Sequence, residues 1–275
     1  MLKDNTFGQY FPGKSPLHQM DPRMKILITI LYIVAIFLAK NVLSFAFLLL
    51  LTLLLIFISR ISLRVILRGI RPVLFIILFT VIFNIFFTDG KGAPLFDYGV
   101  IEIYREGIVR ASLMALRVII LIAGTGVLLT YTTSPIALAD AIEGLLRPLK
   151  KLHVPVHEFA MMMTIALRFI PTLIEETDRI MSAQKARGAD FSSGSIVKRV
   201  KALVPILIPL FVSAFKRAEE LAVAMECRCY RGGEGRTKLR TLHYRFSDFV
   251  WFFLLILVIA AVVLVNRYSP LHIAY

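Results

Sequence analysis

Five stretches with very few charged side chains limit what this chain can fold into more than any other feature. They cover residues 26–39, 42–59, 73–87, 112–131 and 249–266. A membrane-spanning helix needs about 20 consecutive apolar residues. The whole chain is 58% hydrophobic with a mean hydropathy of +0.77, whereas soluble domains are about 45–50% apolar. We therefore predict an all-α integral membrane protein with about five transmembrane helices.

Two of these stretches are short for a span. Residues 26–39 would form a helix of about 21 Å. To cross the membrane, this helix would have to include Met24 and Lys25 at one end and a snorkelling Lys40 at the other.

The distribution of Lys and Arg predicts the orientation of the spans. The loop after the second stretch holds four arginines and no acidic residue, namely Arg60, Arg64, Arg68 and Arg71. Cytoplasmic loops are enriched in Lys and Arg, so we expect this loop and the N-terminus inside the cell. It follows that residues 88–110 lie outside, residues 134–248 lie in the cytoplasm and the C-terminal tail lies outside. The net charge of +14 is then mainly positive-inside charge that faces the lipid bilayer, and we expect no nucleic-acid partner.

The segment GQYFPGKS, residues 8–15, fits the phosphate-binding pattern G-x-x-x-x-G-K-[ST]. That loop requires a buried strand before the first Gly and a helix that begins at the Lys. Only MLKDNTF precedes Gly8, Pro12 lacks the amide that the loop would use, and Pro16 disfavours a helical Ser15. We expect no nucleotide-binding phosphate loop here, so ATP would have to be bound by another chain.

Two long amphipathic helices are predicted in the cytoplasmic region, over residues 156–187 and 196–227. A shorter one over 136–149 would connect them to the fourth span. The segment LVPILIPLFVSAF, residues 203–215, is apolar on all sides, and we expect it to pack against the membrane base or the sister helix. A sixth and a seventh span in this region are the alternative.

The ends of the two long helices resemble each other. The first ends in AQKARG (183–188) and the second in AMECRC (224–229), so that both read Ala-x-x-small-Arg-small. One explanation is an Arg that interacts with the dipole at a helix C-terminus. The other is a long planar donor flanked by small residues, which suits insertion into a groove of a partner. Two such ends would suit a dimeric partner.

Three stretches together resemble the transmembrane T component of energy-coupling factor (ECF) transporters, which import vitamins and metal ions in prokaryotes. SAQKARGAD (182–190) and AMECRCYRGG (224–233) are similar to the two Ala-Arg-Gly motifs of that family. GQYFPGKSPLHQMDPRMK (8–25) is similar to its N-terminal signature. The resemblance covers nearly the whole chain.

The resemblance implies a coupling subunit with no catalytic residues and no cofactor of its own. Two ABC-type ATPase subunits would bind ATP and Mg²⁺, a separate small membrane subunit would capture the substrate, and the chain would lie in the prokaryotic cell membrane. Binding of the ATPases would fall to Ala186, Arg187, Gly188, Cys227, Arg228 and Cys229. Five parts are expected: an N-terminal cytoplasmic segment (1–25), four spans (26–131), a cytoplasmic coupling region (132–248), a last span (249–267) and an external tail (268–275).

The second motif departs from the family pattern, because Cys227 and Cys229 stand where Ala and Gly are usual. Cys can replace Ala, but a Gly at a helix end often has a positive φ. Two outcomes are open. Either the helix continues to Tyr230 and ends at Gly232 and Gly233, or the chain leaves the helix through a strained Cys229.

Other residues were weighed for different chemistry. His153 and His157 have a metal-ligand spacing, but Pro155 separates them and no third ligand follows. His18 and Asp21 could form an acid–base pair, although a Pro-stiffened approach to the membrane explains them better. Arg117 lies within a predicted span, where we expect it to face the bundle interior or to snorkel.

Gly124 and Gly126, also in the fourth span, are expected to allow close helix packing. Two rival functions remain: a stand-alone secondary transporter or channel, and a membrane enzyme that acts on lipid. The first predicts repeated spans with charged or broken segments, and the second predicts clustered His, Asp or Glu at the interface. The sequence shows neither pattern.

Overall fold

The computed structural model describes residues 10–88, 96–98, 101–189, 191, 195–232 and 241–268. The chain divides into two compact units. Unit 1 comprises Met1–Thr6 and Ile142–Arg240, and unit 2 comprises Phe7–Ala141 and Thr241–Tyr275. The prediction for the external tail and most of residues 88–100 falls outside the described residues.

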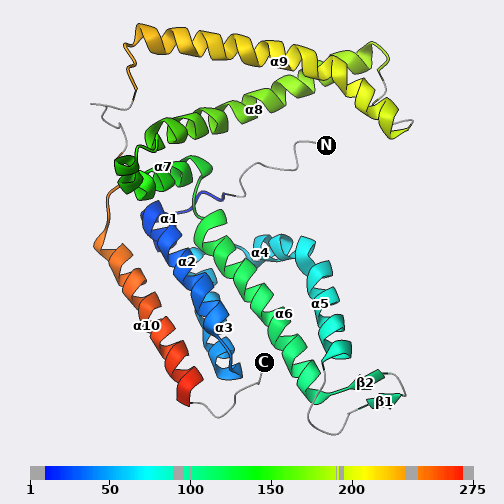
Figure 1. The fold of residues 1–275 in the computed structure, drawn as a ribbon, viewed down its shortest axis with the longest axis vertical. Coiled ribbons are helices and arrows are strands. Elements are labelled where there is room, and N and C mark those ends of the chain that lie inside the picture. Colours follow the sequence, from blue (N-terminus) through cyan, green and yellow to red (C-terminus); the bar gives the residue numbers. More distant parts are fainter. Residues whose placement is uncertain are drawn as a thin grey trace. The chain divides into compact units, whose positions relative to one another are not determined.

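The described residues are almost entirely helical, which confirms the predicted all-α class (Figure 1). The helices are α1 (Pro16–Gln19), α2 (Pro22–Leu38), α3 (Val42–Ser59), α4 (Leu63–Ile70), η1 (Arg71–Val73), α5 (Leu74–Phe87), α6 (Arg105–Thr125), η2 (Gly126–Thr130), α7 (Pro135–Leu146), η3 (Arg147–Leu152), α8 (Val156–Ala186), α9 (Ile196–Cys227) and α10 (Phe246–Tyr268). A short antiparallel hairpin pairs β1 (Phe96–Tyr98) with β2 (Ile101–Ile103).

Five described helical segments are long and apolar enough to cross a membrane. They are Val42–Ser59, Leu63–Phe87, Arg105–Thr130, Val156–Ala186 and Phe246–Tyr268. The predicted span at 26–39 is the helix α2, which has 17 residues and a length of about 26 Å, somewhat below the hydrocarbon thickness. One of the five segments, Val156–Ala186, lies in the region predicted to be cytoplasmic. The alternative of additional spans in that region stays a prediction.

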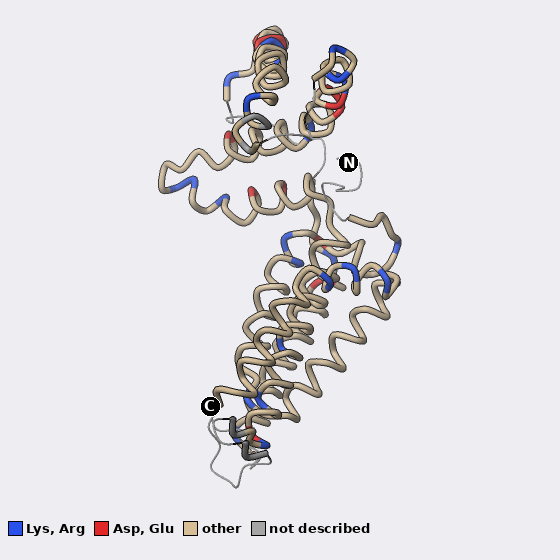
Figure 2. The backbone as a smooth tube through the Cα atoms, turned by 90° about the vertical axis from the view of Figure 1, so that its right-hand side faces the viewer, with Lys and Arg blue, Asp and Glu red and all other residues tan. Residues whose placement is uncertain are grey.

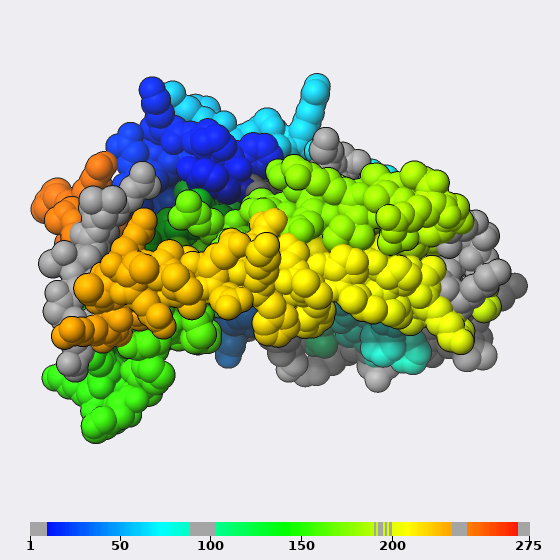
Figure 3. All heavy atoms as spheres, turned by 90° about the horizontal axis from the view of Figure 1, so that it is seen from above, coloured from blue at the N-terminus to red at the C-terminus, as the bar shows by residue number. Residues whose placement is uncertain are grey.

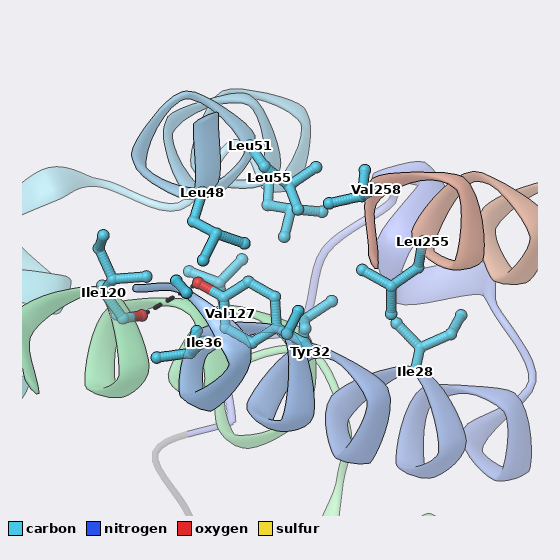
Figure 4. Packing of buried hydrophobic residues seen from close by; sticks show 14 of the residues in the cluster. Ile28, Tyr32, Ile36, Leu48, Leu51, Leu55, Ile120, Val127, Leu255 and Val258 are labelled. Carbon is cyan, nitrogen blue, oxygen red and sulfur yellow. Dashed lines mark hydrogen bonds between the residues drawn. The ribbon is translucent and has the colours of Figure 1, made fainter. Parts of the chain in front are cut away.

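Tyr32 organises the core of unit 2, where α2, α3, α6 and α10 meet (Figure 4). Its side chain is fully buried. The hydroxyl shares a 2.7 Å hydrogen bond with Thr52 Oγ1 and donates to the Ile120 carbonyl at 3.1 Å. A buried tyrosine hydroxyl needs such partners, so these bonds fix the positions of α2, α3 and α6 relative to one another.

Gly124 makes room for this tyrosine. A Cβ atom at position 124 would lie 2.2 Å from the Tyr32 hydroxyl oxygen, and one at Gly126 would lie 2.9 Å from Tyr131 Cε2. The predicted close packing of helices is therefore confirmed for Gly124, whereas Gly126 makes room for Tyr131 at the end of its own helical segment. The helix also changes to π geometry at Gly126–Thr130, as is common where the regular backbone ladder is disturbed.

The end of α10 is tied to the tight turn between α2 and α3. Asn266 Nδ2 donates to the Leu38 carbonyl at 2.6 Å, and its Oδ1 accepts from Ser44 Oγ at 2.9 Å. Arg117 Nη2 reaches the same turn and donates to the Ala39 carbonyl at 2.9 Å, with its guanidinium 5.2 Å from the Phe45 ring centroid. Arg117 therefore faces the bundle interior, which is one of the two predicted positions.

The arginine-rich connection between α3 and α5 contains a helix that the sequence analysis treated as a loop. In α4, Ile66 and Ile70 are buried, while Leu63 and Leu67 on the same helix are exposed. Figure 1 shows that α4 lies across the direction of α5. The helix was missed because its eight residues are too few to establish a periodicity.

Candidate functional site

The two long helices of unit 1 form an antiparallel crossed pair (Figure 1). The first half of α8 faces the second half of α9: Ile165, Phe169 and Leu173 line a groove of about 260 Å³ opposite Ala214 and Leu221. An ion pair supports the crossing, with Arg217 Nη2 2.6 Å from Glu176 Oε2. The observed bounds agree within a residue with the predicted helices at 156–187 and 196–227.

The antiparallel crossing places Arg187 and Arg228 at opposite ends of the pair. Arg228 lines a cavity together with Met161 and Thr164, close to the beginning of α8. Arg187 follows the last residue of the same helix. The separation along α8 between Met161 and Arg187 is about 39 Å, so the two arginines could engage two well-separated partner sites at once.

At the end of α8 the chain forms a Schellman motif, in which Arg187 is the C-cap. The Ala189 amide donates to the Gln184 carbonyl at 3.0 Å, and the Gly188 amide donates to the Lys185 carbonyl at 3.0 Å. This pattern requires a left-handed residue at the position after the cap, and Gly188 has φ = +86°. No atom lies within 4 Å of a Cβ added at Gly188, so the glycine serves the backbone conformation and the space beside it is open.

The end of α9 repeats this geometry with different residues. Arg228 is the C-cap, the Tyr230 amide donates to the Met225 carbonyl at 3.0 Å, and the Cys229 amide donates to the Glu226 carbonyl at 2.8 Å. Cys229 occupies the position of Gly188 and has φ = +55°. Of the two outcomes left open by the sequence, the strained exit is therefore observed, and continuation of the helix to Tyr230 is wrong.

The predicted docking residues are all exposed. This holds for Ala186, Arg187, Gly188, Cys227, Arg228 and Cys229. Both arginines also stand at a helix C-terminus, where a cation interacts favourably with the macrodipole. An Arg that interacts with the helix dipole here is still exposed to solvent. The dipole interaction and the predicted docking to a partner are therefore compatible.

The apolar segment 203–215 is covered by other described residues only in part, and its packing against the membrane base stays a prediction. Leu207 is 49% exposed, Phe211 62% and Val212 65%, while Ile206 is buried. The groove between the two helices involves the later part of α9, where Ala214, Leu221 and Met225 face α8. Figure 3 shows α9, in yellow and orange, as a ridge with its side chains uncovered along most of its length.

His153 and His157, which have a metal-ligand spacing, lie just before α8 and in its first turn. His157 Nδ1 lies 3.1 Å from Glu143 Oε1, and His153 has φ = +60° just after η3. In the described parts of the chain, no three His, Cys, Asp or Glu residues come close enough to hold a metal ion. The side chain of Asp21 caps α2 by accepting from the Arg23 amide at 2.8 Å, so it does not pair with His18.

Sequence reasoning missed a buried polar cluster where unit 2 meets the predicted cytoplasm. Lys25 is 1% exposed and donates to the Thr132 carbonyl at 2.9 Å and to Thr133 Oγ1 at 3.1 Å. Asp248, fully buried, accepts from the Asp21 amide at 3.3 Å. These bonds join the beginning of α2 to the beginning of α10 and to the residues that follow η2. In the sequence, the only sign of this cluster was a charged residue at the edge of an apolar stretch.

Known proteins are similar to this chain over most of its length. The sequence model of the CbiQ family, described as cobalt transport protein, matches residues 13–239. The energy-coupling factor transporter transmembrane protein EcfT of Clostridium kluyveri is 51% identical over 250 residues, which is 91% of this chain and 92% of the relative. The EcfT proteins of Acidaminococcus fermentans and Bacillus subtilis are 54% and 48% identical, over 90% of this chain and 91% and 93% of their own lengths.

Proposed function

This chain belongs to the CbiQ family, and from that membership we propose that it is the T component of an ECF transporter. In this proposal it is a non-catalytic membrane subunit that couples ATP hydrolysis by a partner ATPase dimer to substrate uptake. A separate small membrane subunit captures the substrate, a vitamin or a metal ion. The chain lies in the prokaryotic cell membrane, with its N-terminus in the cytoplasm and its C-terminus outside.

The repeated helix end is the observation that carries the proposal. Two helices end in the same hydrogen-bonded turn, each with an exposed Arg at the C-cap and a left-handed residue after it. The turn holds the base of each Arg side chain in a fixed position. An exposed, pre-positioned guanidinium with small neighbours is suited to enter a groove and form charge-assisted hydrogen bonds there.

The separation of the two ends supports a partner with two copies of that groove. A single compact groove could not receive both arginines, because about 39 Å of helix lies between them. A dimer of two similar subunits presents the same surface twice. Each arginine would then anchor one ATPase subunit, and movement within the dimer would be transmitted through α8 and α9.

The uncovered side of α9 supports a second partner. Six apolar side chains between residues 203 and 212 are 45–65% exposed, namely Leu203, Val204, Leu207, Ile208, Phe211 and Val212, while Ile206 in the same segment is buried. Exposed apolar surfaces of this kind mark protein or membrane contacts. We assign this surface to the substrate-binding subunit.

Substitution of the two arginines tests the proposal. We expect Arg187→Ala and Arg228→Ala each to weaken co-purification of the ATPase subunits from mild detergent, and the double variant to abolish it. Removing one partner of a buried charged pair costs about 2–5 kcal/mol, so affinity measured with purified ATPase should fall by about 30-fold or more. Arg179→Ala is the matched control, because Arg179 is equally exposed on α8 but lies away from the helix end.

Two results would contradict the proposal. One is full ATPase binding and full transport by the double variant. The other is isolation of the chain without any partner from membranes that retain uptake, which would favour a stand-alone secondary transporter or channel.

A further inference from the structure

A cationic cavity lies in unit 2 between the N-terminal segment and the turn from α3 to α4. Its volume is about 220 Å³, and Gly13, Lys14, Ser15, Arg60 and Ser62 are among the residues that line it. None of the lining residues in the described part of the chain is acidic. Sites for drug-sized ligands are larger, at about 300–1,000 Å³, so the cavity suits a small anionic group.

The N-terminal wall of this cavity is a fixed loop. The Phe11 amide donates to the Tyr131 carbonyl at 3.0 Å. His18 Nε2 lies 2.9 Å from the Phe11 carbonyl and His18 Nδ1 lies 2.6 Å from Ser15 Oγ. Because a carbonyl only accepts, Nε2 carries the proton, and Nδ1 accepts from the Ser15 hydroxyl. Burial lowers the pKa of His18, with Lys25 acting in the same direction and the Phe11 carbonyl opposing, so the ring is neutral near pH 7 and holds the loop in place.

Arg60 is held in an unfavourable backbone conformation at the opposite wall. It ends α3 with φ = +56°, a left-handed position that glycine adopts without cost. The backbone at this position would favour glycine, so its conformation does not explain why an arginine stands there. Strained residues cluster at functional sites, and Arg60 lines the cavity. An Arg at this position brings a five-donor cation to the cavity.

The surroundings of the cavity are those of a membrane surface. The exposed Leu63 and Leu67 of α4 lie beside the exposed Arg64 and Arg68, and such an amphipathic helix lies in the interface of a bilayer. Figure 2 shows more Lys and Arg at one end of the helical bundle of unit 2 than at the other. The positive-inside rule assigns this end to the cytoplasmic leaflet, which carries anionic lipids.

We propose that this cavity binds the phosphate headgroup of an anionic phospholipid of the inner leaflet. Lys14 and Arg60 would hold the phosphate from two sides, and the Ser62 hydroxyl would add a donor. The acyl chains would lie along the exposed leucines of α4. The bound lipid would link the N-terminal segment to the turn from α3 to α4, two segments that approach each other around this cavity.

Native mass spectrometry of the full-length chain in neutral detergent, with phosphatidylglycerol added, tests this proposal. We expect Lys14→Gln and Arg60→Gly each to lower retention of phosphatidylglycerol about tenfold, the factor that one charge-assisted hydrogen bond supplies. Arg68→Gln removes the same charge from an exposed position outside the cavity and should change retention by less than about twofold.

Arg60→Gly keeps the test independent of folding. Glycine relieves the left-handed backbone, so this variant should unfold at an equal or higher temperature while it loses the lipid. Equal losses in all three variants would show only diffuse attraction between lipid and cationic surface, and would overturn the proposal. Retention of inorganic phosphate or glycerol phosphate in place of the lipid would identify a soluble anion site and would overturn it as well.

Discussion

At the scale of single residues, three side chains occupy backbone positions that favour glycine. Arg60, His153 and Cys229 have positive φ among the described residues. Cys229 shows what such a position requires, because it reproduces the turn made by Gly188 with the same two hydrogen bonds. The shape of the helix end is therefore kept at the expense of local backbone strain.

Replacement of Cys229 by glycine should stabilise this helix end. A left-handed conformation costs a non-glycine residue about 1–2 kcal/mol, part of which is offset by the greater freedom of glycine in the unfolded chain. We expect the Tyr230 amide, which donates to the Met225 carbonyl, to exchange with solvent deuterium about fivefold more slowly.

Cys227→Gly is the matched control for this change. Cys227 is the last helical residue of α9, where glycine lowers helix stability, so exchange at the same amide should become faster. Faster exchange in Cys229→Gly as well would contradict the assignment of strain to Cys229.

At the scale of helices, much of the fold could be predicted. The ends of α8 and α9 were predicted within a residue because an apolar stripe over nine turns leaves little freedom in where it begins and ends. The beginning of α6 was placed seven residues late, because Arg105, Glu106 and Arg110 interrupt the apolar run although they continue the helix. Hydropathy detects the apolar part of a helix, so a polar first turn is missed.

The contacts among the helices could not be predicted. That Tyr32 would donate to the Ile120 carbonyl depends on three helices that are far apart in sequence. The docking residues were predicted only from their repetition and from their resemblance to a family, and they stay a prediction. The cavity at Lys14 and Arg60 was not found, since it joins two segments that no sequence pattern connects.

Gly124→Ala should destabilise the packing of α2 against α6. The new methyl group would meet the Tyr32 ring and hydroxyl at 2.2–2.4 Å, and overpacking of this kind costs about 1–3 kcal/mol. We expect a lower unfolding temperature in detergent and partial recovery in the double variant with Tyr32→Leu, which shortens the clashing side chain.

Gly107→Ala provides the comparison within the same helix. Its added Cβ would find its nearest neighbour at 3.4 Å, an ordinary contact, and alanine favours the helix. This variant should be as stable as the parent or more so. If Gly124→Ala were equally harmless, Tyr32 would not fix the distance between α2 and α6.

At the scale of the whole molecule, the exposed apolar side of α9 indicates a surface that a partner covers in the assembled transporter. We expect Phe211→Cys, in a background with Cys227 and Cys229 replaced, to react readily with a water-soluble maleimide when the chain is alone in nanodiscs. Addition of the substrate-binding subunit should suppress this reaction, while Arg179→Cys on α8 should react equally in both states. Protection of position 211 without any partner would show that the bilayer covers this surface.

The repetition of one turn with two different flanking sequences has a consequence for how such docking points evolve. What is common to Ala-Arg-Gly and Cys-Arg-Cys is a backbone shape and one guanidinium, and neither depends on the chemistry of the flanking side chains as long as they are small. Under the proposed docking, we therefore expect the flanking positions to vary without loss of recognition. A search for the three letters would overlook such drifted sites, whereas a search for an Arg that caps a helix ahead of a left-handed residue would find them.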